Sequence, residues 1–137
     1  MNVPSTWNPS YSVGHPVLDE QHMRLLALVG QIAACAEDDS LEGTNQFHVI
    51  LGELSVYAMT HFHTEEQLLS QCNYALLKEQ RAEHQRYKVG LGDFHLSALS
   101  GVVDKVGLKQ YLSDWWLHHI LESDMRYKDA LQGISPA

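Results

Sequence analysis

The chain has 137 residues, of which 45% are hydrophobic, and it carries a formal net charge of −8. This length suits one domain with a single core, and the hydrophobic fraction argues against a disordered chain. The acidic balance excludes nucleic acid or an anionic membrane as the main partner, because both bind basic surfaces. We therefore expect a single domain over residues 1–137 that binds neither nucleic acid nor membrane.

The sequence also indicates a cellular compartment. The longest uninterrupted apolar run, Leu25–Val29, is too short to span a bilayer, and residues 1–4 lack the basic stretch and apolar core of a secretory signal. The two cysteines, Cys35 and Cys72, form no CxxC pair, so they indicate neither a disulfide framework nor a thiolate metal site. These features predict a cytoplasmic protein.

Proline marks the start of the fold. Residues 1–16 contain three prolines and a glycine without any helical period, which predicts an extended arm. In the rest of the chain, apolar residues recur every three or four positions, and no sustained alternation indicates a strand. The predicted helices cover 18–37, 44–71, 75–96 and 105–131. Short polar connections make successive helices antiparallel, so we expect an all-α, up-down-up-down four-helix bundle.

Each predicted helix carries polar residues on its apolar stripe. In chain order they are His22, then His61 and Glu65, then Gln80 and His84, then His119. Residues four apart share a helix face, so both pairs point inward together. Burying these groups is costly unless they satisfy one another or bind a metal. Four imidazoles and a carboxylate from four helices predict a divalent metal site that suits iron, manganese or zinc.

The other histidines do not share this pattern. A lone buried histidine is more often structural than a ligand, and only the coincidence on four helices favours ligands. Five histidines are predicted to be surface or loop residues: His15, His48, His63, His95 and His118. Three aromatic residues are predicted to pack in the core: Tyr57, Trp115 and Trp116. The run from Lys78 to Arg86 is predicted to be a solvated helix face, apart from Gln80 and His84.

Motif searches narrow the chemistry further. No Glu is followed three residues later by His, which excludes the ferritin-like di-iron arrangement. The sequence contains no HExxH, GxGxxG or phosphate-loop motif, so hydrolase and nucleotide-binding readings have no support.

The inward residues belong to a longer ordered set of motifs. The set comprises Trp7, Val13-Gly14, Asp19-Glu20-Gln21-His22, Tyr57, His61-Phe62-x-x-Glu65-Glu66, Tyr74, His84, Trp115-x-x-x-His119-Ile120-x-x-x-Asp124 and Tyr127. It covers nearly the whole chain and resembles the hemerythrin family, especially the bacterial single-domain forms called bacteriohemerythrins. The resemblance implies a non-heme centre of two iron ions, bridged by an oxo or hydroxo group, that binds dioxygen reversibly or a small anion such as azide.

The resemblance also implies a role for each residue. His22 and His61 would hold the iron with the open coordination position, and His84 and His119 would hold the other iron. Glu65 and Asp124 would bridge the two irons. A dry apolar pocket around the open iron, including Ile120 and Leu25 or Leu26, would favour oxygen binding by limiting oxidation and proton access.

Two positions qualify this transfer. Asp124 lies five residues after His119, about 140° around an ideal helix, and Glu122 fits the inward face better by period alone. The family pattern favours Asp124, with Glu122 as the structural alternative. Gln80 stands where the family has a histidine, and three roles remain open for it. Its amide oxygen binds metal, or its amide holds a water in the vacant position, or the centre loses affinity for one metal.

Three classes of function follow. The leading expectation is a non-enzymatic oxygen-binding protein for transport, storage, delivery or sensing. The alternative is a di-iron enzyme with peroxidase, oxidase or nitric oxide-handling activity, for which an exchangeable position at the Gln80 iron would be useful. The third is a structural or regulatory bundle with zinc or without metal.

Overall fold

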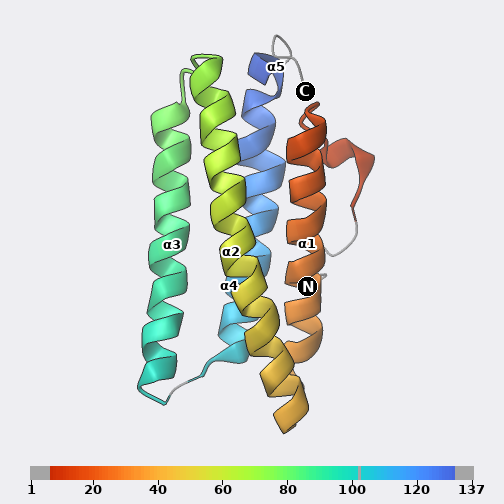
Figure 1. Cartoon of the computed structure of the whole chain (residues 1–137), viewed down its shortest axis with the longest axis vertical. Helices are drawn as coiled ribbons and strands as arrows, with labels where there is room; N and C mark the ends of the chain where they lie inside the picture. The colour runs from red at the N-terminus through yellow and green to blue at the C-terminus, as the bar shows by residue number, and fades with distance from the viewer. Residues whose placement is uncertain (1–6, 102, 132–137) are drawn as a thin grey trace.

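The computed structural model describes residues 7–101 and 103–131, which form a bundle of long helices without any strand (Figure 1). The elements are η1 (Pro9–Tyr11), α1 (Pro16–Ala36), α2 (Leu41–Gln71), α3 (Leu77–Leu99), α4 (Lys105–His118), η2 (His119–Ser123), η3 (Asp124–Tyr127) and α5 (Lys128–Leu131). Successive long helices run in opposite directions, with α1 packed on α2 and α4, and α3 packed on the same two helices. The predicted all-α four-helix bundle is confirmed. None of the described helices is long and apolar enough to cross a membrane.

Local signals set the helix starts. α1 begins at Pro16 rather than residue 18, because proline suits the first helical position. α2 begins at Leu41 rather than residue 44, because the Ser40 hydroxyl accepts a hydrogen bond from the Gly43 N–H at 3.0 Å. α3 begins at Leu77 rather than residue 75, after a turn in which Asn73 has a φ of 55°. It ends at Leu99 rather than residue 96.

The predicted arm over residues 1–16 is only partly extended. Residues 1–6 lie outside the described part of the chain, η1 is a helical turn, and Pro16 already belongs to α1. The Ser12 hydroxyl and the Val13 N–H both donate to the Asp19 carboxylate, at 2.5 Å and 2.8 Å. These bonds fix the end of the arm against the first turn of α1.

A polar layer separates two apolar clusters inside the bundle. The smaller cluster consists of Val13, Leu18, Leu69, Tyr127 and Leu131. The larger cluster fills the rest of the core and includes Leu25, Phe62 and Trp116. On α1, His22 lies between Leu18 of the smaller cluster and Leu25 of the larger one. The inward polar residues therefore have apolar side chains on both sides along the bundle axis.

Most of the other predicted positions agree with the structure. His48, His63, His95 and His118 are exposed, and Trp116 is fully buried. Trp115 and Tyr57 are half-buried against the larger cluster. His15, predicted as a surface or loop residue, lies in the loop before α1, but its side chain is buried at 3% exposed. His15 precedes α1 directly, at the point where the arm is held against that helix.

Candidate metal centre

The segment predicted as one helix over 105–131 is not a single α-helix, because η2 and η3 separate α4 from α5. This interruption sets the positions of the site residues that follow His119. η2 is a π-turn, in which the Asp124 N–H donates to the His119 carbonyl five residues earlier. A π-turn accommodates one extra residue and brings position i+5 back over position i. Asp124 therefore lies on the inward face beside His119. An ideal α-helical period would place Glu122 on the inward face, but this expectation is wrong. Glu122 is exposed and pairs with Nδ1 of His118 at 3.0 Å.

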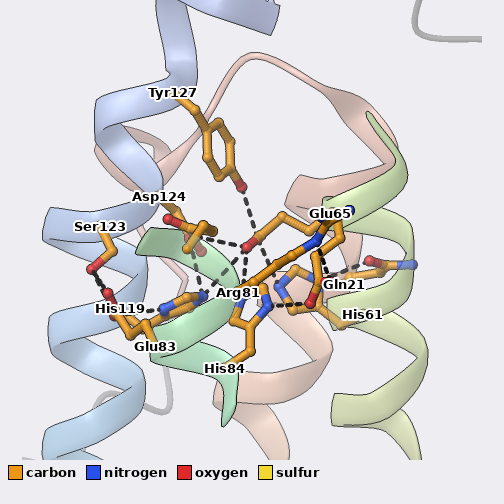
Figure 2. A network of polar contacts seen from close by, with 12 residues as sticks. Gln21, His61, Glu65, Arg81, Glu83, His84, His119, Ser123, Asp124 and Tyr127 are labelled. Atoms are coloured by element: carbon orange, nitrogen blue, oxygen red, sulfur yellow. Dashed lines mark hydrogen bonds and ion pairs between the residues drawn. The ribbon is translucent and has the colours of Figure 1, made fainter. Parts of the chain in front are cut away.

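Seven buried polar side chains from all four long helical segments lie in the polar layer, and Figure 2 shows His61, Glu65, His84, His119 and Asp124 among them. Each is 5% exposed or less: His22, His61, Glu65, Gln80, His84, His119 and Asp124. Every candidate ligand predicted from the sequence is thus brought to one place.

Glu65 lies at the middle of this cluster. Its Oε2 atom is 3.1 Å from Nε2 of His61, and its Oε1 atom is 2.9 Å from Nε2 of His84. Because these two imidazoles approach different oxygens, the carboxylate has one oxygen toward each half of the cluster.

Asp124 repeats this arrangement. Its Oδ2 atom is 2.9 Å from Nε2 of His22, and its Oδ1 atom is 3.0 Å from Nε2 of His119. We call the His22 and His61 imidazoles, with Glu65 Oε2 and Asp124 Oδ2, the first subsite. The second subsite consists of the His84 and His119 imidazoles with Glu65 Oε1 and Asp124 Oδ1.

The donor atoms fit metal ions. Nε2 of His22, His61 and His119 and Oδ2 of Asp124 are buried without a well-aligned hydrogen bond. Unsatisfied buried polar atoms are rare in folded proteins, so several in one cluster call for an explanation such as a bound ion. Ligand atoms of His22, His61, Glu65 and Asp124 lie within 4.8 Å of one another, as do those of Glu65, His84 and His119. Imidazole nitrogen and carboxylate oxygen are suitable donors for iron, manganese or zinc.

Three of the imidazoles are oriented by hydrogen bonds on their outer side. Nδ1 of His61 donates to Oε1 of Gln21 at 2.8 Å, and Nδ1 of His84 donates to Oε2 of Glu66 at 2.7 Å. Nδ1 of His119 donates to Oε1 of Glu83 at 2.8 Å. These acceptors hold a proton on Nδ1, so a neutral ring would direct its Nε2 lone pair at a metal in the cluster, as metal-binding histidines require.

Sequence reasoning missed some of these supporting residues. Glu83 was expected on the solvated face of the run 78–86, but it faces the C-terminal segment. There it accepts hydrogen bonds from both His119 and the Ser123 hydroxyl, the latter at 2.6 Å. Its place directly before His84 was the available signal, because a neighbour of an inward residue flanks the core. The Tyr127 hydroxyl donates to Oε2 of Glu65 at 3.0 Å, a contact that the motif alone did not reveal.

Charge–charge contacts shift the proton affinities of the metal-free cluster. Burial lowers the pKa of His22, but the Asp124 and Glu65 carboxylates outweigh burial and raise it to about 9. The pKa of His119 is also raised against its burial by Asp124, Glu65 and Glu83. Burial opposes ionisation of Glu65, yet His61, His119 and His22 hold its pKa well below the usual value. The carboxylates are therefore anionic and balanced by imidazolium in the metal-free protein.

Aromatic and aliphatic side chains exclude water from the cluster. Phe62 stacks on the His84 imidazole with ring centroids 4.0 Å apart, and Trp115 stacks on His119 at 4.4 Å. Leu25, Leu26 and Ile120, the predicted pocket residues, are each 1% exposed or less and belong to the larger apolar cluster.

A buried centre of four imidazoles and two carboxylates inside a four-helix bundle defines a helical metal-binding protein. The model of the hemerythrin HHE cation-binding domain matches residues 13–131, and the chain belongs to this family. It is 28% identical to a hemerythrin-like protein of Naegleria gruberi, with 93% of this chain and 94% of that protein covered. It is 22% identical to the bacteriohemerythrin of Stenotrophomonas maltophilia, with 92% and 80% covered. A crystal structure of a hemerythrin mutant superposes with a TM-score of 0.80 at 22% identity, covering 92% of this chain and 95% of that one.

Proposed function

We propose that this chain is a di-iron protein that binds dioxygen reversibly. The observation that carries the proposal is the position of Glu65 and Asp124, which each offer one oxygen to each of two imidazole pairs. A carboxylate that faces two metal sites at once can bridge two cations and offset their charge. Membership of the hemerythrin family supports iron as the metal and dioxygen as the ligand.

The proposal assigns a role to each residue. His22 and His61 hold one iron, His84 and His119 hold the other, and Glu65 and Asp124 bridge the pair. When bound, the two irons supply the electrons for reversible dioxygen binding. Gln21, Glu66 and Glu83 keep the imidazole rings in the orientation that binds metal, since each accepts a hydrogen bond from one Nδ1 atom.

The surroundings of the cluster favour binding over turnover. Leu25, Leu26 and Ile120 lie in the apolar core, and we propose that they form a dry pocket beside the first subsite. A dry pocket slows proton delivery to a bound oxidant and so slows irreversible oxidation. Tyr127 donates to Glu65, and burial raises its pKa well above the usual range, so its hydroxyl remains protonated.

Metal analysis and optical spectroscopy test the proposal. Protein expressed in iron-replete medium should contain two irons per chain, and the reduced protein should gain a visible charge-transfer band under oxygen and lose it under argon. Zinc alone would favour a structural bundle. Irreversible oxidation in one exposure, with peroxide consumption that depends on added substrate, would favour a peroxidase or oxidase.

A further inference from the structure

Gln80 bonds to the carboxylate oxygens of the second subsite, whereas the Tyr127 hydroxyl bonds to Oε2 of Glu65 in the first. The Gln80 side chain is 5% exposed and enters the cluster from α3, one turn before His84. The amide nitrogen Nε2 donates to Oε1 of Glu65 at 2.8 Å and to Oδ1 of Asp124 at 2.6 Å. Both acceptors are the oxygens that face the second subsite. The first subsite has no corresponding amide among the described residues.

Of the three roles left open by the sequence, this contact supports neither ligation through the amide oxygen nor a held water, and it gives a structural cause for the third, a lower affinity for one metal. In the structure the amide nitrogen, and not the amide oxygen, faces the carboxylates. A nitrogen that bonds to both oxygens lies where a cation of the second subsite would have to reach them. An NH₂ group has no lone pair to offer a metal, so it competes with a cation for these oxygens.

The same contact has the opposite effect on the first subsite. Two buried carboxylates that lie close together repel each other. N–H donors to Oε1 of Glu65 and Oδ1 of Asp124 reduce this repulsion. With Oε1 of Glu65 and Oδ1 of Asp124 held by Gln80, the opposite oxygens stay directed at His22 and His61. Of the buried donor atoms without a well-aligned hydrogen bond, Nε2 of His22 and His61 and Oδ2 of Asp124 belong to the first subsite, and Nε2 of His119 belongs to the second. The Tyr127 hydroxyl bonds to one first-subsite oxygen, Oε2 of Glu65, whereas Gln80 bonds to the second-subsite oxygens of both carboxylates. The second subsite is therefore the more obstructed of the two.

We infer that Gln80 is a positioning residue, not a metal ligand, and that it makes the two subsites fill in order. The first subsite, with His22 and His61, binds its cation first, while Gln80 stays bonded to Oε1 of Glu65 and Oδ1 of Asp124. The His84–His119 subsite binds second and more weakly, because the Gln80 amide must turn away from Glu65 and Asp124. This inference rests on the proposed two-metal centre and adds an order of filling.

Titration of the metal-free full chain with Co²⁺ tests the order. Visible absorption reports coordination, and equilibrium dialysis reports the amount bound. We expect two steps, with the second dissociation constant at least about 10-fold larger than the first. His61→Ala should weaken the first step, and His84→Ala should remove the second step while leaving the first in place. A single step that binds two ions with equal affinity would overturn the inference but leave the two-metal centre intact.

Two variants of Gln80 separate obstruction from ligation. Gln80→Leu removes the amide donor and any possible ligand while keeping an inward side chain, so the second step should be tighter than in the parent. Gln80→His supplies an imidazole at the same position and should tighten the second step about 10-fold or more. Gln85→His, the same substitution at an exposed site of α3, is the matched control and should leave both steps unchanged.

Three further results of these titrations would contradict the inference, and the last of them would also contradict the proposed function. A second step at least about 10-fold weaker in Gln80→Leu than in the parent would identify Gln80 as a ligand and overturn the inference. Unchanged titrations in both Gln80→Leu and Gln80→His would show that the residue does not act on the second subsite, which also overturns it. If the parent chain bound no Co²⁺ and no iron, the proposed function would fail together with the inference.

Discussion

Asp124 and His119 are joined twice, once through the backbone and once through their side chains. The Asp124 N–H donates to the His119 carbonyl in a π-turn, and Oδ1 of Asp124 lies 3.0 Å from Nε2 of His119. π-turns inside α-helices are uncommon and often mark functional sites. Here the turn places the Asp124 carboxylate on the inward face, which this residue would not reach in a regular α-helix.

The π-turn predicts which acidic residue the metal needs. Asp124→Ala should weaken iron retention by at least about 10-fold, because one of the two shared carboxylates is lost. Glu122→Ala is the control, since its pair with His118 is exposed and contributes little. Iron content after dialysis against a chelator measures the difference. Equal losses in the two variants would mean that the centre does not use Asp124.

Glu83 should support the second subsite although it lies outside the cluster. Glu83→Ala removes the acceptor for His119 and Ser123, and we expect metal affinity at the second subsite to fall about 10- to 100-fold. Glu79→Ala, an exposed change on the same helix, should have no effect. Co²⁺ titration of both variants checks this, and a normal second step in Glu83→Ala would show that the hydrogen bond does not orient His119 for binding.

Metal binding should release protons. In the metal-free protein His22 carries a proton below its pKa of about 9, and the raised pKa of His119 acts in the same direction. A metal binds only the neutral imidazole, so at pH 7 binding must displace these protons, and affinity should rise with pH until about 9. Calorimetry at pH 7 in buffers of different ionisation enthalpy counts the protons. A binding heat that is independent of the buffer would contradict the expectation.

The proposed apolar pocket makes a prediction about oxidation. Ile120→Ala should cost about 2–5 kcal/mol of stability by leaving a cavity, and it should also speed the irreversible loss of the oxygen-dependent band. Leu112→Ala in α4 is matched to it in burial and expected cost, but it lies about two turns from His119. Urea unfolding and the decay of the band under air distinguish the two effects. Similar oxidation rates in both variants would remove Ile120 from the pocket.

The sequence predicted the bundle and most of the site because both depend on helical period. A His or Glu that replaces an apolar residue at period 3.6 must point inward, which identified His22, His61, Glu65 and His84 from spacing alone. Period failed where the backbone leaves the α-helical form, and Asp124 was chosen only through the family resemblance. Helical period also gives no information on contacts between helices. The hydrogen bonds from Gln80 to Glu65 and from His119 to Glu83 therefore required the structure.

A ferrous titration counts the irons that the two shared carboxylates hold. The metal-free chain is titrated with Fe²⁺ without oxygen, and each sample is then exposed to oxygen and returned to argon. We expect a visible band that saturates at about two equivalents per chain, because the Glu65 and Asp124 carboxylates serve both subsites. If oxygen binding is reversible, the band should disappear under argon. A band that saturates at one equivalent, or that never reverses, would contradict these expectations.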